Sequence, residues 1–192
     1  CSFAGCAYVP IDVSVGEERK KYIINLLKPN IIIDKNIENI MDNENYTDIN
    51  EIFMKPDDLY YIIFTSGSTG NPKGVKVLYK NINSCVKWLK KMINVEKEVI
   101  LNQANFSFDL SVADIYLSLI SASKHYILER EIQKDYRKLF NQLKNSQATL
   151  AVMTPSFAEL LLLDKTFNNN LMPKLKTILF CGEKLLNKTV KE

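Results

Sequence analysis

Apolar positions in the second half of the chain fall into two alternating patterns. Short continuous apolar runs predict buried strands, and between them apolar residues recur every three or four positions, which predicts helices with one buried side. The strands are predicted at 99–103, 125–128, 149–153 and 176–181, and the helices at 110–121, 135–145, 156–163 and from Leu185 onward. This alternation indicates an α/β fold with a mainly parallel sheet that is covered by helices.

The part of the chain before these elements is less regular. An amphipathic stripe predicts a helix over 15–27, which Pro29 ends. The run Ile31–Ile33 predicts a short buried strand, and the stretch 36–58, rich in Asn and Asp, predicts an irregular surface connection. Further on, Asn81 is predicted to cap the helix that precedes the strand at 99–103.

A strand–loop–strand predicted over 60–78 carries the strongest chemical signal. An aromatic and apolar strand, Tyr61–Phe64, runs into a loop of Gly, Ser and Thr that closes on Pro-Lys-Gly. Glycines let backbone N–H groups approach a polyanion closely, and the hydroxyl groups and the lysine ammonium add further donors. The loop is therefore predicted to bind the phosphates of ATP through Thr65, Ser66, Gly67, Ser68, Thr69, Gly70, Lys73 and Gly74.

This loop is not a Walker A loop, which disfavours a P-loop ATPase. The Walker pattern places Gly before its Lys and Ser or Thr after it, whereas Lys73 stands between Pro72 and Gly74. The residues Val75–Leu78 alternate like a strand rather than opening a helix, so the loop bridges two strands. A flexible Gly/Ser linker is the remaining alternative, and the aromatic strand and the Pro-Lys-Gly closure argue against it.

Composition and charge exclude several classes of protein. The 46% hydrophobic and 24% charged content is ordinary for a soluble globular protein. The net charge of +3 is too small to indicate a nucleic-acid or membrane partner, and no run approaches the roughly 18–20 apolar residues of a membrane helix.

The cysteines and the only histidine predict no metal site and no hydrolase triad. Cys1, Cys6, Cys85 and Cys181 show no metal-ligand spacing with His125. Cys6 and Cys85 are predicted to be small buried residues of a protein in a reducing compartment, the cytoplasm. His125 falls in a predicted strand, where a structural role is expected.

Polar and small residues follow the predicted strands at the edge where ligands bind in parallel sheets. Asp109 follows the strand at 99–103, and two roles are open for it: pairing with an ammonium group in a partly dry pocket, or capping a helix. After the strand at 149–153, Thr154 and Pro155 fit a helix start as well as a ligand contact. Cys181 ends the last predicted strand.

Four segments resemble, in order and spacing, the motifs of amino-acid adenylation domains, which are adenylate-forming enzymes. They are Phe3–Asp12, Tyr61–Val75, Phe106–Tyr116 and Ile178–Leu185, and together they extend over nearly the whole chain. The resemblance implies a ligase that uses Mg²⁺ and ATP to form an aminoacyl adenylate and then loads a carrier-protein phosphopantetheine thiol. It also implies that residues 1–192 are part of the large N-terminal AMP-binding domain of a longer protein. The catalytic residues and the small C-terminal domain are then expected beyond residue 192, and the 192 residues alone are expected to be inactive.

Within this family, the segments most resemble those of D-alanine–carrier protein ligases, which serve teichoic acid D-alanylation. That resemblance implies that Asp109 holds the substrate amino group and that Cys181 lines the side-chain pocket. The apolar walls then available indicate a small or medium uncharged side chain, with D-alanine favoured: Leu110, Ala113, Val152, Leu179 and Cys181.

Two departures from those ligases keep alternatives open. Asn105 stands where they usually have Pro, and Ala113 where they usually have Met, so the pocket is expected to be roomier than alanine needs. An adenylation domain of a nonribosomal peptide synthetase with another neutral amino acid is therefore one alternative. A non-catalytic nucleotide-binding remnant is another, of a different class.

Overall fold

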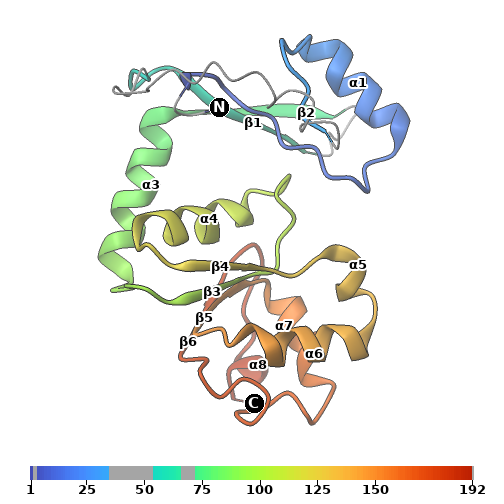
Figure 1. Cartoon of the computed structure of the whole chain (residues 1–192), viewed down its shortest axis with the longest axis vertical. Coiled ribbons are helices and arrows are strands. Elements are labelled where there is room, and N and C mark those ends of the chain that lie inside the picture. Colours follow the sequence, from blue (N-terminus) through green and yellow to red (C-terminus); the bar gives the residue numbers. More distant parts are fainter. Residues whose placement is uncertain (2–3, 35–53, 66–71, 192) are drawn as a thin grey trace, which may run out of the picture. The chain divides into compact units, whose positions relative to one another are not determined.

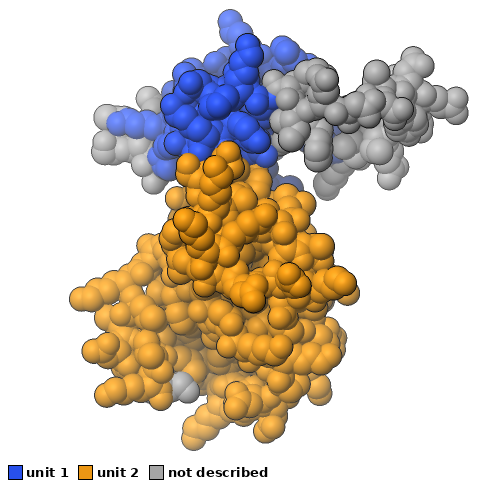
Figure 2. All heavy atoms as spheres, turned by 90° about the vertical axis from the view of Figure 1, so that its left-hand side faces the viewer, with its two compact units in different colours: residues 1–81 blue, residues 82–192 orange. Residues whose placement is uncertain are grey.

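The computed structural model of this chain describes residues 1, 4–34, 54–65 and 72–191 (Figure 1). These residues form two compact units, Cys1–Asn81 and Ile82–Glu192 (Figure 2). Each unit has its own strands.

The second unit is built around a four-stranded parallel sheet with the strand order β4-β3-β5-β6. Helices connect successive strands, as parallel pairing requires, so the predicted α/β fold with a mainly parallel sheet is confirmed. In chain order the elements are α3 (Tyr79–Met92, of which residues from Ile82 belong to this unit), β3 (Val99–Asn102), α4 (Leu110–Ile120), β4 (Lys124–Ile127), α5 (Arg130–Gln133), α6 (Tyr136–Ser146), β5 (Leu150–Met153), α7 (Pro155–Leu162), β6 (Thr177–Phe180) and α8 (Asn187–Lys191).

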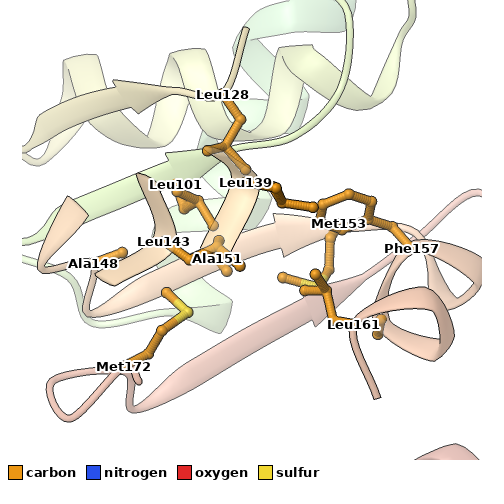
Figure 3. Close-up of a cluster of buried hydrophobic side chains, with 11 residues drawn as sticks. Leu101, Leu128, Leu139, Leu143, Ala148, Ala151, Met153, Phe157, Leu161 and Met172 are labelled. Atoms are coloured by element: carbon orange, nitrogen blue, oxygen red, sulfur yellow. The ribbon is translucent and has the colours of Figure 1, made fainter. Parts of the chain in front are cut away.

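Both faces of this sheet are buried, and strand residues alternate between two hydrophobic clusters. Leu101, Ala151 and Met153 pack on one face with side chains from α6 and α7 (Figure 3). Ile100 and Val152 pack on the other face, with residues of α3 and α4. The continuous apolar runs of β3 and β5 follow from this arrangement, because each successive side chain points to a different covered face.

The first unit contains an antiparallel pair, β1 (Leu59–Thr65) and β2 (Lys73–Leu78), and one helix, α1 (Glu17–Leu27). The segment around Tyr8 lies parallel to β1: Tyr8 N–H donates to Tyr60 O at 3.2 Å, and Ile62 N–H donates to Tyr8 O at 3.1 Å. The rings of Tyr8, Tyr60, Tyr61 and Tyr79 pack against one another with centroids 5.6–6.2 Å apart. The predicted strands at 60–78 and the predicted first helix are therefore present.

Two predictions for the first unit were wrong. Ile31–Ile33 form no strand, and these side chains are 50–67% exposed. An apolar run is buried as a strand only where another strand pairs with it, and no described strand does. Cys6 is exposed rather than buried, whereas Cys85, in the second unit, is partly buried.

Asn81 has a different role from the predicted one. Helix α3 begins at Tyr79, so Asn81 lies in its first turn, and its Oδ1 accepts a hydrogen bond from Leu78 N–H at 2.9 Å. This is the reaching-back half of a capping box, in which a side chain at the third helical position satisfies the backbone before the helix. The predicted irregular surface connection holds for residues 55–58, but Met54 is buried at 7% exposure, and 36–53 lie outside the described residues.

Candidate functional site

The predicted phosphate-binding residues lie at the end of the β1–β2 hairpin. Thr65 and Lys73 are opposite each other as the last pair of the ladder, and Thr65 Oγ1 donates to Lys73 O at 3.5 Å. Both side chains are exposed. Ser66, Gly67, Ser68, Thr69 and Gly70 lie outside the described residues, so the predicted contacts of these five with phosphate stay a prediction. The hairpin brings the two ends of the loop together and presents the Lys73 ammonium to solvent.

Gly74 has a packing role that the sequence did not indicate. It pairs with Phe64 across the ladder, and a Cβ at this position would lie 2.9 Å from Ile62 Cγ2 and 3.2 Å from Phe64 Cζ. Real Cβ atoms essentially never make contacts as short as the first of these. The absence of a side chain at Gly74 therefore makes room for the β1 side chains beside the loop, apart from any role in binding phosphate.

Asp109 lies at the N-terminus of α4, beyond the carboxyl end of β3. It occupies the N-cap position, but its side chain accepts no capping hydrogen bond, and its backbone is in the helical region (φ −61°, ψ −23°) rather than the extended region usual for a cap. The helix-capping alternative therefore does not account for this carboxylate. Asp109 is exposed, so the partly dry surroundings that the sequence suggested are not present among the described residues.

The loop between β3 and Asp109 is shaped by Asn105. Its Oδ1 accepts hydrogen bonds from Ser107 N–H at 3.0 Å and from Ser107 Oγ at 3.1 Å, which makes an Asx turn. At the other end of the loop, the buried Ser111 Oγ donates to Phe108 O at 2.8 Å. Asn105 thus gives the chain a defined turn at the position where the resembling ligases have Pro.

The predicted pocket residues come together on one face of the sheet. All five belong to, or pack against, the same hydrophobic cluster as Ile100: Leu110, Ala113, Val152, Leu179 and Cys181. Val152 and Leu110 are 0% and 5% exposed, so they form the layer behind the surface. Ala113, Leu179 and Cys181 are partly exposed and are therefore the residues that can contact a ligand.

Cys181 connects this cluster with Asp109. Burial raises the pKa of the Cys181 thiol, and the negative charges of Asp109 and Asp114 raise it further. The thiol is consequently neutral at pH 7, which suits a pocket wall rather than a nucleophile. Asp109 itself precedes Leu110, which is buried in the apolar cluster, so it lies at the end of α4 that borders this cluster.

Sequence reasoning missed a buried polar group around Asp114, a residue that is 0% exposed. Asn102 Nδ2 donates to Asp114 Oδ2 at 2.7 Å and to Ala104 O at 2.9 Å. His125 Nε2 lies 3.4 Å from Asp114 Oδ1, without hydrogen-bond geometry. Burial raises the pKa of Asp114, and this outweighs the opposite effects of His125, Asn102 and the Ile115 backbone.

Asp114 falls inside Phe106–Tyr116, one of the four segments that resemble adenylation domains, but nothing in its sequence neighbourhood marks it as buried. The ring of Phe106 lies 6.2 Å from that of His125, so the group also contacts the loop that leads to Asp109.

Thr154 and Pro155 form the start of helix α7, which is one of the two roles that the sequence left open for them. Thr154 is the N-cap, its Oγ1 accepts from Phe157 N–H at 3.2 Å, and Pro155 follows at the first helical position. Two surface cavities lie elsewhere in the second unit. One, of about 450 Å³, lies beside the C-terminal ends of α3 and α4, and the other, of about 340 Å³, lies between α7, β6 and α8. Neither contains a predicted site residue.

Within residues 1, 4–34, 54–65 and 72–191, no group of three or more His, Cys, Asp or Glu side chains is arranged to hold a metal ion. No helix in those ranges has the length and apolar character to cross a membrane.

Comparison with known proteins places the whole chain in one family. Residues 1–192 match the family model of the AMP-binding enzymes, and the chain belongs to that family. It is 36% identical over 210 residues to the D-alanine–D-alanyl carrier protein ligase of Bacillus cereus (strain B4264) and 36% identical over 209 residues to that of Bacillus anthracis (strain CDC 684 / NRRL 3495). Both alignments cover 100% of this chain and 42% of the relative. The predicted resemblance is confirmed, and the chain spans less than half the length of these curated relatives.

Solved structures show the same fold. The Vibrio cholerae adenylation domain AlmE, in complex with glycyl-adenosine-5'-phosphate, matches 98% of this chain and 43% of its own, with a TM-score of 0.79 and 22% identity. VinN, in complex with L-aspartate, matches 96% of this chain and 52% of its own, with a TM-score of 0.73 and 21% identity. At these identities the likeness concerns the fold.

Proposed function

We propose that this chain is part of an ATP-dependent ligase that activates a small neutral amino acid, D-alanine being favoured, and loads it onto a carrier protein. The observation that carries the proposal is the Asp109 carboxylate. It lies beyond the carboxyl end of a parallel strand and caps no backbone N–H group, and the residue that follows it, Leu110, is buried in the apolar cluster. An anion beside an apolar wall matches an amino acid with a charged amino group and a small uncharged side chain.

The proposed reaction has two steps. The amino-acid carboxylate attacks the α-phosphorus of ATP, a phosphorus–oxygen bond forms, and pyrophosphate leaves. The thiol of a carrier-protein phosphopantetheine then attacks the carbonyl carbon of the aminoacyl adenylate, and AMP leaves. Mg²⁺ supplies charge neutralisation on the phosphates when it accompanies ATP, and no described residue is assigned to it.

The chain's own residues contribute binding and orientation. The Lys73 ammonium and the donors of the loop at Thr65–Gly74 are proposed to neutralise the β- and γ-phosphates, which lowers the barrier as charge develops on pyrophosphate. Asp109 is proposed to hold the ammonium group so that the substrate carboxylate faces the α-phosphorus.

The proposed substrate class rests on the pocket walls. Ala113, Leu179 and Cys181 offer apolar contacts and no charge for a side chain to pair with. The AlmE structure contains the adenylate of glycine, the smallest amino acid, which is the kind of intermediate proposed here. The similarity to D-alanine–D-alanyl carrier protein ligases favours D-alanine and a carrier protein as partners. A role in teichoic acid D-alanylation and a cytoplasmic location are part of the same proposal.

The test is amino-acid-dependent ATP–pyrophosphate exchange with the full-length protein and a panel of D-alanine, L-alanine and larger neutral amino acids. Strong preference for D-alanine supports the carrier-protein ligase. Preference for a larger side chain would instead assign the protein to peptide-synthetase adenylation domains, with Ala113 as the reason. If none of the amino acids supported ATP–pyrophosphate exchange, and the reading frame stopped soon after Glu192, the non-catalytic remnant would be favoured.

The isolated chain of 192 residues provides a second test. It is proposed to be inactive, because residues that complete the site are expected beyond its end. Formation of an aminoacyl adenylate by the purified chain would contradict this.

A further inference from the structure

The first turn of α7 is completed by a residue from a distant part of the chain. Pro155 has no N–H group, and Thr154 accepts the N–H groups of Phe157 and Ala158 at 3.2 Å each. The remaining donor of the turn, Ser156 N–H, donates to Glu183 Oε2 at 3.0 Å. Ser156 Oγ also donates to Glu183 Oε1, at 2.9 Å. One carboxylate, 27 residues away in sequence, is therefore held at two points.

This link joins the carboxyl ends of the two strands that carry the pocket walls. Glu183 follows β6 and Ser156 follows β5, and between them Cys181 N–H donates to Met153 O at 3.3 Å. The chain turns from Cys181 to Glu183 through Gly182, whose φ of +86° is in the left-handed region that other residues rarely adopt. The backbone of Cys181 is thus fixed on one side by the ladder and on the other by Glu183.

We propose that Glu183 is a positioning residue that sets the width of the amino-acid side-chain pocket by holding Cys181 against the β5 end of the cluster. The inference rests on the proposed function, since the pocket is that of the proposed substrate. The carboxylate of Glu183 accepts hydrogen bonds from Ser156, which is not a pocket wall, so Glu183 acts through the turn at Gly182.

The strength of the link follows from its charge. A carboxylate that accepts hydrogen bonds at a helix N-terminus gains from both the charged acceptor and the helix dipole. Its neutral amide analogue keeps both contacts, because an amide oxygen accepts from Ser156 N–H while the amide nitrogen donates to Ser156 Oγ. Glu183→Gln is therefore a conservative variant, and Glu183→Ala is the disruptive one.

The experiment measures ATP–pyrophosphate exchange by the full-length protein with a small and a larger neutral amino acid. Glu183→Ala is expected to raise KM for the small amino acid about tenfold, the equivalent of one charge-assisted hydrogen bond. KM for ATP is expected to change by less than about twofold, because Glu183 is not proposed to take part in binding the nucleotide. The preference for the small over the larger amino acid should fall, and Glu183→Gln should restore most of it.

Two further variants make the comparison specific. Ser156→Ala removes one of the two contacts, and the double variant with Glu183→Ala should be no worse than Glu183→Ala alone, as expected for residues that act as a pair. Glu159→Gln is the matched control: Glu159 lies on the same helix, and its Oε1 accepts from Thr189 Oγ1 at 2.7 Å, away from the strand ends. It should leave both KM values and the preference unchanged.

The outcomes separate this inference from the proposed function. Unchanged preference in Glu183→Ala, or equal rises in KM for ATP and amino acid, would overturn the positioning role while leaving the ligase assignment intact. If the unaltered protein showed no exchange with any amino acid, the proposed function would fail. Amide hydrogen exchange would then test whether the Ser156–Glu183 contact holds the turn in place. Faster amide exchange at residues 179–183 in Glu183→Ala supports this, and an unchanged rate refutes it.

Discussion

Replacing Gly74 by Ala tests whether this glycine is required for packing as well as for binding. The added methyl group would point at Ile62 Cγ2 at 2.9 Å and at the ring of Phe64 at 3.2 Å. Ile62 is only 7% exposed and has little room to move, whereas Phe64 is partly exposed and its ring can shift. The contact with Ile62 therefore determines the result.

The expected cost can be worked out from two opposing effects. Overpacking a filled site costs about 1–3 kcal/mol. Replacing glycine by alanine also lowers the conformational entropy of the unfolded chain, which offsets about 0.4–1 kcal/mol of the overpacking cost. The net loss expected for Gly74→Ala is about 1 kcal/mol, since one methyl group meets one rigid and one movable neighbour. A loss of this size lowers Tm by about 2–4 °C in a protein of 150–250 residues.

The assay is thermal unfolding followed by near-ultraviolet circular dichroism of the packed tyrosines around Tyr8, which lie in the same unit as Gly74. Gly16→Ala is the matched control, because a Cβ there meets nothing within 4 Å and the φ of −57° suits alanine. That variant should unfold within about 0.5 kcal/mol of the unaltered protein. If Gly74→Ala proved as stable as Gly16→Ala, the packing argument would be wrong.

Three further predictions concern the pocket, the buried polar group and the core. Asp109→Asn should raise KM for the amino acid about fivefold with little change for ATP in pyrophosphate exchange, a modest effect because an exposed ion pair is weakened by water. Asp114→Asn should change the pH dependence of unfolding. The folded pKa of Asp114 is raised, so the native state binds its proton more tightly than the unfolded chain does, and this carboxyl lowers stability progressively as pH rises above its ordinary value of 3.8. The variant should lack that decline in urea titrations at a series of pH values. Leu143→Ala should cost about 2–5 kcal/mol in the same urea assay, because Leu143 is 0% exposed in the cluster of Figure 3.

Each of these has a result that would contradict it. An unchanged KM in Asp109→Asn would remove the amino-group role. Parallel pH curves for Asp114→Asn and the unaltered protein would show that burial does not perturb this carboxyl. For the core, Leu163→Ala is the control, since Leu163 is 78% exposed. Similar losses for Leu143→Ala and Leu163→Ala would mean that the core is not packed as described.

The parallel sheet and the positions of Asp109 and Cys181 after strand ends could be predicted because both depend on local patterns. The strands β3 and β5 are covered on both faces, so their residues form apolar runs that are visible in the sequence. Asp109 and Cys181 follow strand ends, and ligands of parallel sheets bind at that edge. These positions could be identified without knowledge of any tertiary contact.

Other features depend on contacts between distant residues, and the sequence could not reveal them. An aspartate on an amphipathic helix usually faces solvent, and Asp114 is buried only because Asn102 and His125 reach it from two strands. The bonds between Ser156 and Glu183 join residues 27 positions apart. The opposite error occurs at Ile31–Ile33, where an apolar run predicted a buried strand but no described strand pairs with it.

Because strand side chains alternate between two clusters, neighbouring residues of one strand are subject to different packing constraints. Val152 belongs to the cluster of the pocket walls, whereas its neighbours Ala151 and Met153 belong to the cluster on the opposite face. Substitutions without shared contacts usually have additive effects on stability. A substitution in one cluster is therefore expected to change stability without disturbing the packing of the other cluster. Alternate positions along β5 therefore form two separate sets for mutagenesis, and the stability cost of changing one set should be largely independent of changes in the other.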